Sequence, residues 1–176
     1  MDYYQYRFVQ NFTCFLESDY IEVRKLYTFR SNLSHQQYFV WIDKCKHNLY
    51  VIKFHLKNHR YSQRRYNILT NLHEARTIVF TCISILLNEV YSKEKSASFG
   101  FIASNLENED KYNTKRLCFY SSFITTFIGY KTFQHFKYID RSAYLLIPHN
   151  VIQETPNIIN NIEEMFNEHD FIECDT

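Results

Sequence analysis

The chain has only two glycines, Gly100 and Gly129, among its 176 residues. Loops that cradle phosphate depend on glycine, because only glycine lets the backbone approach a ligand closely and take a positive φ without cost. Neither the P-loop pattern nor G-x-G-x-x-G occurs in the sequence. The sequence therefore excludes the nucleotide-binding loops that are built on glycine.

Disulfide patterns and long apolar runs are also missing. The five cysteines are an odd number and none forms a C-x-x-C pair, which is typical of a reducing compartment. The first residues, MDYYQYRF, contain no apolar run of signal-peptide length, and no later run is long enough to span a membrane. We therefore expect a cytoplasmic protein with no membrane partner.

Charge is unevenly distributed although the net charge is only +1. Residues 24–76 hold eleven Lys or Arg against two carboxylates, whereas residues 151–176 hold seven Asp or Glu and no Lys or Arg. Two interpretations remain open. The first is a solvated basic face with an acidic tail folded back on it, and the second is a surface for an anion or a nucleic acid that the tail covers.

Hydrophobic residues make up 45% of the chain and aromatic residues 18%, which is enough for a packed core. We expect one domain over residues 1–150, followed by an acidic C-terminal helix and tail over residues 151–176. Runs rich in β-branched and aromatic residues predict strands in the first half, with a hairpin at His47 and Asn48. These strands are expected at residues 12–17, 24–30, 37–44 and 49–56.

The period of the apolar residues then changes to that of helices. A long helix is predicted over residues 62–91, and a second over 114–128 with Asn113 as its N-cap and Gly129 at its C-terminal end. A last helix is expected after Thr155 as N-cap and Pro156 at the first helical position. Further strands are predicted at residues 97–104, 133–138 and 142–148.

This order of strands and helices, over residues 12–148, resembles the GNAT acetyltransferase superfamily. The local motif is the run from Asn113 to Tyr120, because a family helix at this place opens with Asn and carries Tyr seven residues later. The resemblance implies an α/β (α+β) fold, a mixed and largely antiparallel sheet flanked by two main helices. It also implies that Tyr120 acts as the general acid and that Asn113 contacts acetyl-CoA.

The family's pyrophosphate-binding turn has the pattern R-x-x-G-x-G/A, and here it corresponds to residues 60–65. Tyr61, Gln63 and Arg65 fill the glycine positions, and Arg116 replaces a small residue early in the second helix. Side chains there stand where phosphate oxygens would meet bare N–H groups. The cofactor-binding residues implied by the resemblance are Arg60, Gln63, Arg64, Arg65 and Asn113.

The missing glycines favour a GNAT-like protein that is non-catalytic and acts by binding or regulation, without a cofactor. Its expected partner is another protein or a second copy of the chain, in a bacterial toxin–antitoxin or phage-defence setting. The apolar stripe of the last helix is the predicted contact surface. This stripe consists of Ile158, Ile159, Ile162, Met165 and Phe166.

Two alternatives remain open. The first is an acyl-CoA-dependent N-acyltransferase that uses acetyl-CoA, with Tyr120 as the general acid; no general base is assigned. The second is a nucleic-acid-binding module that uses the basic region from Arg24 to Arg76, with Tyr61 and Tyr66 as stacking groups.

A metal site is not expected. Zinc prefers four nitrogen or sulfur ligands that converge tetrahedrally. Cys45 and His47 share one face of a predicted strand, but His55 and His59 lie on either side of a strand end. We therefore interpret these histidines as residues of a hairpin.

Overall fold

The computed structural model describes residues 2–13, 20–67, 73–105, 109–110 and 112–168. Its strands form one seven-stranded sheet in the order β1-β2-β3-β4-β5-β7-β6, in which only β4 and β5 pair in parallel. The fold is therefore the predicted α+β type with a mixed, largely antiparallel sheet. The strands are β1 (Tyr6–Thr13), β2 (Ile21–Arg30), β3 (Gln37–Cys45), β4 (Leu49–Leu56), β5 (Ser98–Ile102), β6 (Phe133–Tyr138) and β7 (Ala143–Pro148).

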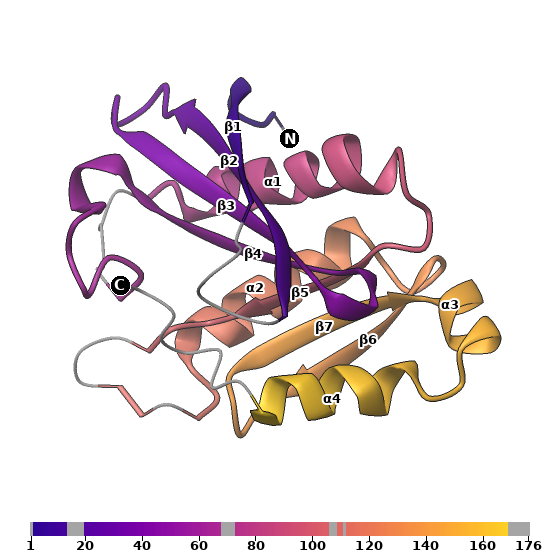
Figure 1. Cartoon of the computed structure of the whole chain (residues 1–176). Coiled ribbons are helices and arrows are strands. Elements are labelled where there is room, and N and C mark those ends of the chain that lie inside the picture. The colour runs from indigo at the N-terminus through magenta and orange to yellow at the C-terminus, as the bar shows by residue number, and fades with distance from the viewer. Residues whose placement is uncertain (1, 14–19, 68–72, 106–108, 111, 169–176) are drawn as a thin grey trace.

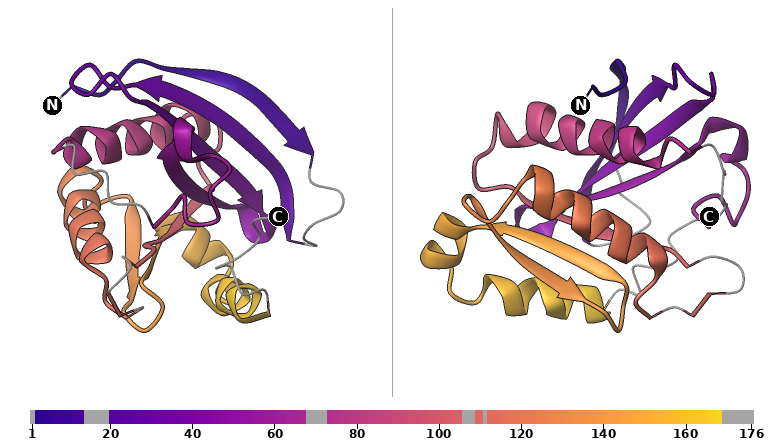
Figure 2. Two further views of the ribbon diagram at one scale, coloured as in Figure 1. Left: turned by 90° about the vertical axis from the view of Figure 1, so that its left-hand side faces the viewer. Right: turned by 180° about the vertical axis from the view of Figure 1, so that it is seen from behind.

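Helices cover both faces of the sheet (Figure 1). On one face lie α1 (Ala75–Ile85), which continues into the π-helical turn η3 (Leu86–Tyr91), and α2 (Lys115–Phe127). The short α3 (His149–Glu154) follows β7, and α4 (Ile158–Glu168) lies on the opposite face, as the edge-on view in Figure 2 shows. None of the helices in the described ranges is long and apolar enough to cross a membrane.

Most strand predictions are confirmed. The bounds of β4 and β6 agree with the predicted ranges, and the hairpin between β3 and β4 turns at His47 and Asn48, whose φ angles are 60° and 55°. The first predicted strand, residues 12–17, was wrong. The strand is β1, which ends at Thr13, and residues 14–19 lie outside the described ranges.

The long helix was predicted to begin too early. It begins at Ala75, whereas residues 62–67 form turns in which the Arg65 N–H donates to the Ser62 carbonyl at 3.1 Å. Residues 68–72 of the predicted helix lie outside the described ranges. A helix needs an apolar face to pack, and the run from Ser62 to Asn67 supplies only one large ring, Tyr66.

The N-cap of α2 was wrong by one residue. Thr114 is the N-cap, and its hydroxyl accepts a hydrogen bond from the Leu117 N–H at 3.2 Å. Asn113 instead has a φ of 49°, a left-handed conformation that Asn tolerates better than most residues, and its N–H donates to the Ile139 carbonyl at 2.9 Å. Gly129 has a φ of 64° after the helix, as predicted for a C-terminal glycine.

The core consists of two clusters, one on each face of the sheet. The first cluster lies between the sheet and the helices α1 and α2, and it contains Tyr27, Val40, Ile85, Phe99 and Leu117. The second cluster joins the opposite face to α3 and α4, and its sheet residues include Leu49, Val51 and Ile147. Because each strand alternates between the two faces, one sheet supplies both clusters.

The helix α4 docks on the chain's own sheet. The side chains of Ile158, Ile162 and Met165 are buried in the second cluster, and Ile159 and Phe166 pack against it. The helix begins at Ile158, so the predicted start with Thr155 as N-cap and Pro156 at the first helical position was wrong. The Ile158 N–H donates to the Thr155 carbonyl at 3.0 Å in the preceding turn.

An irregularity marks the outer strand of the sheet. The register between β1 and β2 shifts between Phe8 and Gln10, so Val9 is an extra residue in β1. Beyond this bulge, Phe12 pairs with Arg24 of β2. Phe8 and Val9 are both exposed large apolar residues at this edge.

We predict that Ile162→Ala destabilises the chain much more than Ile159→Ala. Ile162 is fully buried, so its truncation leaves a cavity and costs about 2–5 kcal/mol, whereas Ile159 is only partly buried. Urea unfolding of both variants measures the difference. Because the helix packs within its own chain, the loss should not depend on protein concentration, and a concentration-dependent loss would contradict this docking.

Candidate functional site

A cleft opens where β4 and β5 diverge. These strands pair at only three positions, Leu49 with Ser98, Tyr50 with Phe99 and Val51 with Gly100. Beyond these three pairs β4 remains paired with β3 and β5 remains paired with β7. The space between β4 and β5 widens there into a cleft of about 1490 Å³. Strands that separate in this way expose backbone polar groups, which an extended ligand or water can satisfy.

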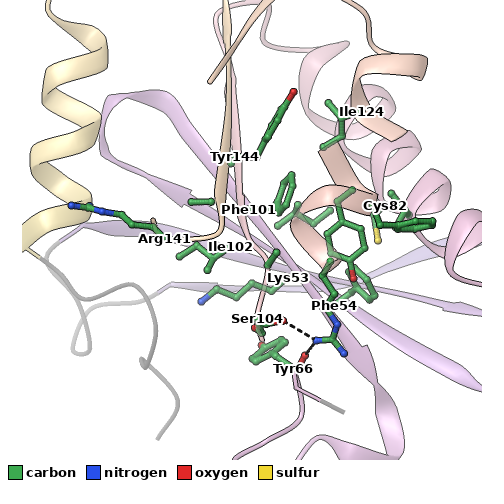
Figure 3. Close-up of a pocket in the computed structure, with 18 of the residues that line it drawn as sticks. Lys53, Phe54, Tyr66, Cys82, Phe101, Ile102, Ser104, Ile124, Arg141 and Tyr144 are labelled. Carbon is green, nitrogen blue, oxygen red and sulfur yellow. Dashed lines mark hydrogen bonds between the residues drawn. The ribbon is translucent and has the colours of Figure 1, made fainter. Parts of the chain in front are cut away.

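The walls of the cleft are mainly apolar and aromatic. Phe54 of β4 and Phe101 of β5 line it together with Cys82 of α1 and Ile124 of α2, as the close-up in Figure 3 shows. Polar side chains also line it. They include Lys53, His55, Gln63, Arg65, Tyr66, Ser104, Lys115, Arg116, Asp140, Arg141 and Glu163.

Arg116 joins the two sides of the cleft. Its guanidinium donates to the carbonyl of Tyr66, which follows β4, and to the carbonyl of Ser104 at 3.5 Å, which follows β5; Figure 3 draws both bonds. The Arg65 guanidinium lies 5.1 Å from the centre of the Tyr66 ring. A charged group and an aromatic ring therefore occupy the mouth of the cleft, where the family resemblance implies space for a cofactor arm.

Tyr120 of α2 lies among aromatic rings in the cleft. Its ring centre is 6.0 Å from that of Phe54 and 5.6 Å from that of Phe101. Burial raises the pKa of the Tyr120 phenol to about 12, against a smaller lowering by Arg116. The phenol is therefore protonated at neutral pH and can donate a hydrogen bond, but its described neighbours provide no carboxylate or imidazole in contact with it.

The N-terminus of α1 holds a carboxylate of the chain itself. Glu74, which directly precedes the helix and is only 4% exposed, accepts hydrogen bonds from four hydroxyls. These come from Tyr4 at 3.0 Å, Ser34 at 2.6 Å, Tyr38 at 3.0 Å and Ser31. Burial alone would raise the pKa of Glu74, but the hydroxyl donors outweigh it and hold the pKa below its ordinary value. Glu74 is thus a structural anion at the positive end of the helix.

The N-terminus of α2 also holds a carboxylate. Glu109 accepts a hydrogen bond from the Lys115 N–H at 2.6 Å, and its own carbonyl accepts one from the Asn105 amide at 3.0 Å. Both helices that border the cleft therefore begin beside an anion that belongs to the chain.

The predicted cofactor-binding residues are only partly brought together. Gln63 and Arg65 line the cleft, whereas Arg60, Arg64 and Asn113 are exposed and do not belong to its lining. The guanidinium of Arg60 stacks 4.5 Å from the ring centre of Tyr61, which is 85% exposed. The turn at residues 60–65 also does not lead directly into α1, since the helix starts at Ala75.

The residues considered for zinc do not converge. Cys45 is buried beside β4, and His55 is engaged through both ring nitrogens: Nδ1–H donates to the Leu56 carbonyl at 2.9 Å, and Nε2 accepts from the Trp41 indole at 3.2 Å. His47 lies in the hairpin turn. No group of three His, Cys, Asp or Glu side chains within the described ranges is arranged to hold a metal ion.

Several residues of the site were not singled out from the sequence. Lys53 alternates with apolar residues of β4, and this alternation was the available signal, whereas His55 was considered only as a zinc ligand. Arg141 of the turn between β6 and β7 also reaches the cleft, on the side of α4 (Figure 3). Nothing local in the sequence indicates that this turn lies beside α4, where Arg141 donates to Asn167.

Comparisons with protein-family models, with curated proteins and with solved structures found no match to this chain.

We predict that Glu74→Gln lowers the free energy of unfolding by roughly 2 kcal/mol at neutral pH, because hydrogen bonds to a charged acceptor are replaced by weaker ones. The native pKa of Glu74 is lowered, so the wild-type advantage is present above its unfolded pKa and is lost as pH falls through the native pKa. Urea unfolding from pH 7 to pH 3 measures this. The exposed Glu164→Gln is the control, and an advantage that persists at the acid end would contradict the assignment.

Proposed function

We propose that this chain is a GNAT-like protein that acts by binding and not by acyl transfer. Its cleft between β4 and β5 retains the position of a ligand site but is adapted against an anionic acyl carrier. We propose both the binding role of this cleft and the membership of the chain in the GNAT family.

The observation that carries the proposal is the pair of carboxylates at the helix N-termini. A helix N-terminus attracts an external phosphate because its N–H groups and dipole are positive. Glu74 lies at the start of α1, and Glu109 accepts directly from the first N–H of α2. At the start of α2 a pyrophosphate would meet an N–H group that is already paired, and at the start of α1 the buried Glu74 already supplies the anion.

The arrangement of Arg116 supports the same conclusion. The guanidinium bridges the carbonyls of Tyr66 and Ser104 across the mouth of the cleft. A pantetheine arm would have to break this bridge and displace a charged side chain. The only glycines are in the middle of β5 and after α2, so neither lies in a loop that could hold phosphate.

The GNAT resemblance is supported by the order of the elements. Four strands precede α1, β5 lies between α1 and α2 in the sequence, and two strands follow, as the resemblance implies. The proposed partner is another macromolecule or a second copy. The predicted contact stripe of α4 is buried in the second cluster, so a partner would need another surface unless α4 undocks.

We predict that isothermal titration calorimetry of the full chain with acetyl-CoA detects no saturable binding at ligand concentrations up to about 1 mM, which corresponds to a binding free energy weaker than about −4 kcal/mol. Arg116→Ala, which removes the bridge, tests whether the mouth alone excludes the ligand. Arg76→Ala on α1 is the matched control, since its side chain is exposed and does not line the cleft. Micromolar binding by the wild type, lost in Arg65→Glu, would overturn the proposal.

A second candidate function is an acyl-CoA-dependent N-acyltransferase, and the position of Tyr120 favours it. The phenol lies in the cleft, is protonated at neutral pH and comes from the helix and spacing that the resemblance implies. In this function Tyr120 would donate its proton to the departing thiolate, and the substrate amine would lose a proton to a base that the described residues do not identify.

This second function predicts that acetyl-CoA is consumed in the presence of a polyamine or peptide amine, with release of free thiol. Tyr120→Phe should lower kcat by about 10²–10⁴-fold with little change in KM, because a general acid acts in the transition state. Ser122→Ala, at an exposed position of the same helix, is the control. Thiol release that is equal in the two variants would exclude Tyr120 as the general acid.

A further inference from the structure

A row of aromatic side chains crosses the sheet on the face opposite α1 and α2. It runs from Phe12 of β1 through Trp41 and Phe39 of β3 to His55 of β4 and ends at Tyr66. Successive ring centres are 5.5, 6.4, 5.9 and 5.3 Å apart. We call these five residues the aromatic row.

The register of the strands places the row on one face. Phe39 pairs with His55 across β3 and β4, and cross-strand partners point to the same side of a sheet. Phe12 of β1 pairs with Arg24 of β2, and Arg24 pairs with Asp43 of β3. Asp43 and Trp41 are two residues apart on β3 and therefore lie on the same face. The neighbours of opposite parity, such as Tyr38 and Val40, belong to the first core cluster on the other face.

Cations lie over the rings of the row. The guanidinium of Arg24 is 5.9 Å from the Trp41 ring centre, the ammonium of Lys57 is 5.7 Å from that of Phe39, and Arg65 is 5.1 Å from that of Tyr66. Positive groups and aromatic faces therefore alternate along the row. Phe12, Phe39 and Trp41 are partly exposed, unlike the buried rings of the first cluster.

The charged side chains that β1–β4 place on this face are mostly positive. By register, Arg7, Arg30 and Lys53 lie on it as well, since they pair with Thr28, Gln37 and Trp41. The described residues of β1–β4 place one carboxylate here, Asp43, which is 1% exposed and is held by Arg24 at 2.7 Å and Lys53 at 3.7 Å. The other acidic residue of these strands, Glu22, pairs with Lys44, whose ammonium lies over the Tyr50 ring of the first cluster.

The helix α4 packs at the other end of these strands. The β2–β4 residues in its cluster are Ile21, Cys45, Leu49 and Val51, which precede or follow the row along each strand. Figure 2 shows α4 beside the lower part of the sheet in the edge-on view. The row and its cations thus form a surface distinct from the second core cluster.

We infer that the aromatic row is a binding surface for single-stranded nucleic acid. Aromatic side chains on a sheet stack unpaired bases regardless of their identity, while nearby Lys and Arg neutralise the phosphates. Neighbouring rings of the row meet at tilted or edge-to-face angles, so bases would stack separately on the partly exposed rings of Phe12, Phe39 and Trp41. A protein partner would require acidic groups to balance the same cations and would gain little from the stacking geometry.

Trp41 is the only tryptophan of the chain and lies in the row between Phe12 and Phe39, so its fluorescence reports the proposed contact directly. We predict that the full chain titrated with 15-nucleotide oligo(dT) or oligo(U) shows saturable quenching of Trp41, with a matching rise in anisotropy of a labelled oligonucleotide. Affinity should fall with salt, with a slope of about −0.7 in log–log form for each phosphate contacted. A difference between oligo(U) and oligo(dU), which carry the same base, would indicate contact with the 2′-hydroxyl.

The charge-reversal variants Arg7→Glu and Lys57→Glu test the location. Each should weaken binding by about tenfold and reduce the salt slope. Lys137→Glu, at an exposed position of β6 near the opposite edge of the sheet, makes the same change in net charge and should bind like the wild type. Thermal unfolding of all three variants confirms that each is folded.

Two results would overturn the inference. One is the absence of both quenching and anisotropy change at low salt. The other is binding that leaves Trp41 unquenched or that Lys137→Glu weakens as much as Lys57→Glu does, since the contact would then lie elsewhere. The inference rests on the proposed binding function but fails separately from it, because calorimetry with acetyl-CoA probes the cleft whereas quenching of Trp41 probes the row.

Discussion

The early end of the pairing between β4 and β5 is the constraint on which the rest of this structure depends. Three parallel residue pairs hold the two halves of the sheet together. Beyond Val51 and Gly100, β4 pairs only with β3 and β5 pairs only with β7. The cleft, the bridge of Arg116 and the position of Tyr120 all result from this separation. A longer pairing would close the cleft and leave the side chains of Phe54 and Phe101 as ordinary core residues.

Acidic side chains of the chain itself lie at the positive N-terminal ends of α1 and α2. Glu74 ties the start of α1 to the N-terminal segment through Tyr4 and to β3 through Tyr38, and Glu109 satisfies the first N–H of α2. A helix end that needs no outside anion stabilises the folded chain without a ligand. These two carboxylates lie at the starts of the helices on one face of the sheet, whereas the cations of the aromatic row lie on the opposite face.

Local patterns in the sequence predicted the strands well, because β-branched and aromatic alternation is a property of each strand alone. The start of α1 was missed because packing decides it. The N-cap of α2 was missed because Asn113 takes a left-handed conformation and donates its N–H to Ile139, which lies far along the chain. The cleft and the aromatic row were beyond local reasoning. Phe12, Trp41 and His55 are far apart in the sequence, and only the strand register brings them onto one face.

The bulge in β1 has a consequence for the growth of the sheet. An outer strand normally offers a regular ladder of N–H and C=O groups that another strand can continue. The extra residue Val9 breaks that ladder midway and increases the local twist, just where Phe8 and Val9 are exposed. A strand from another molecule therefore finds only two short, misaligned stretches to join, and the irregular edge protects this aromatic-rich chain against polymerising through its own sheet.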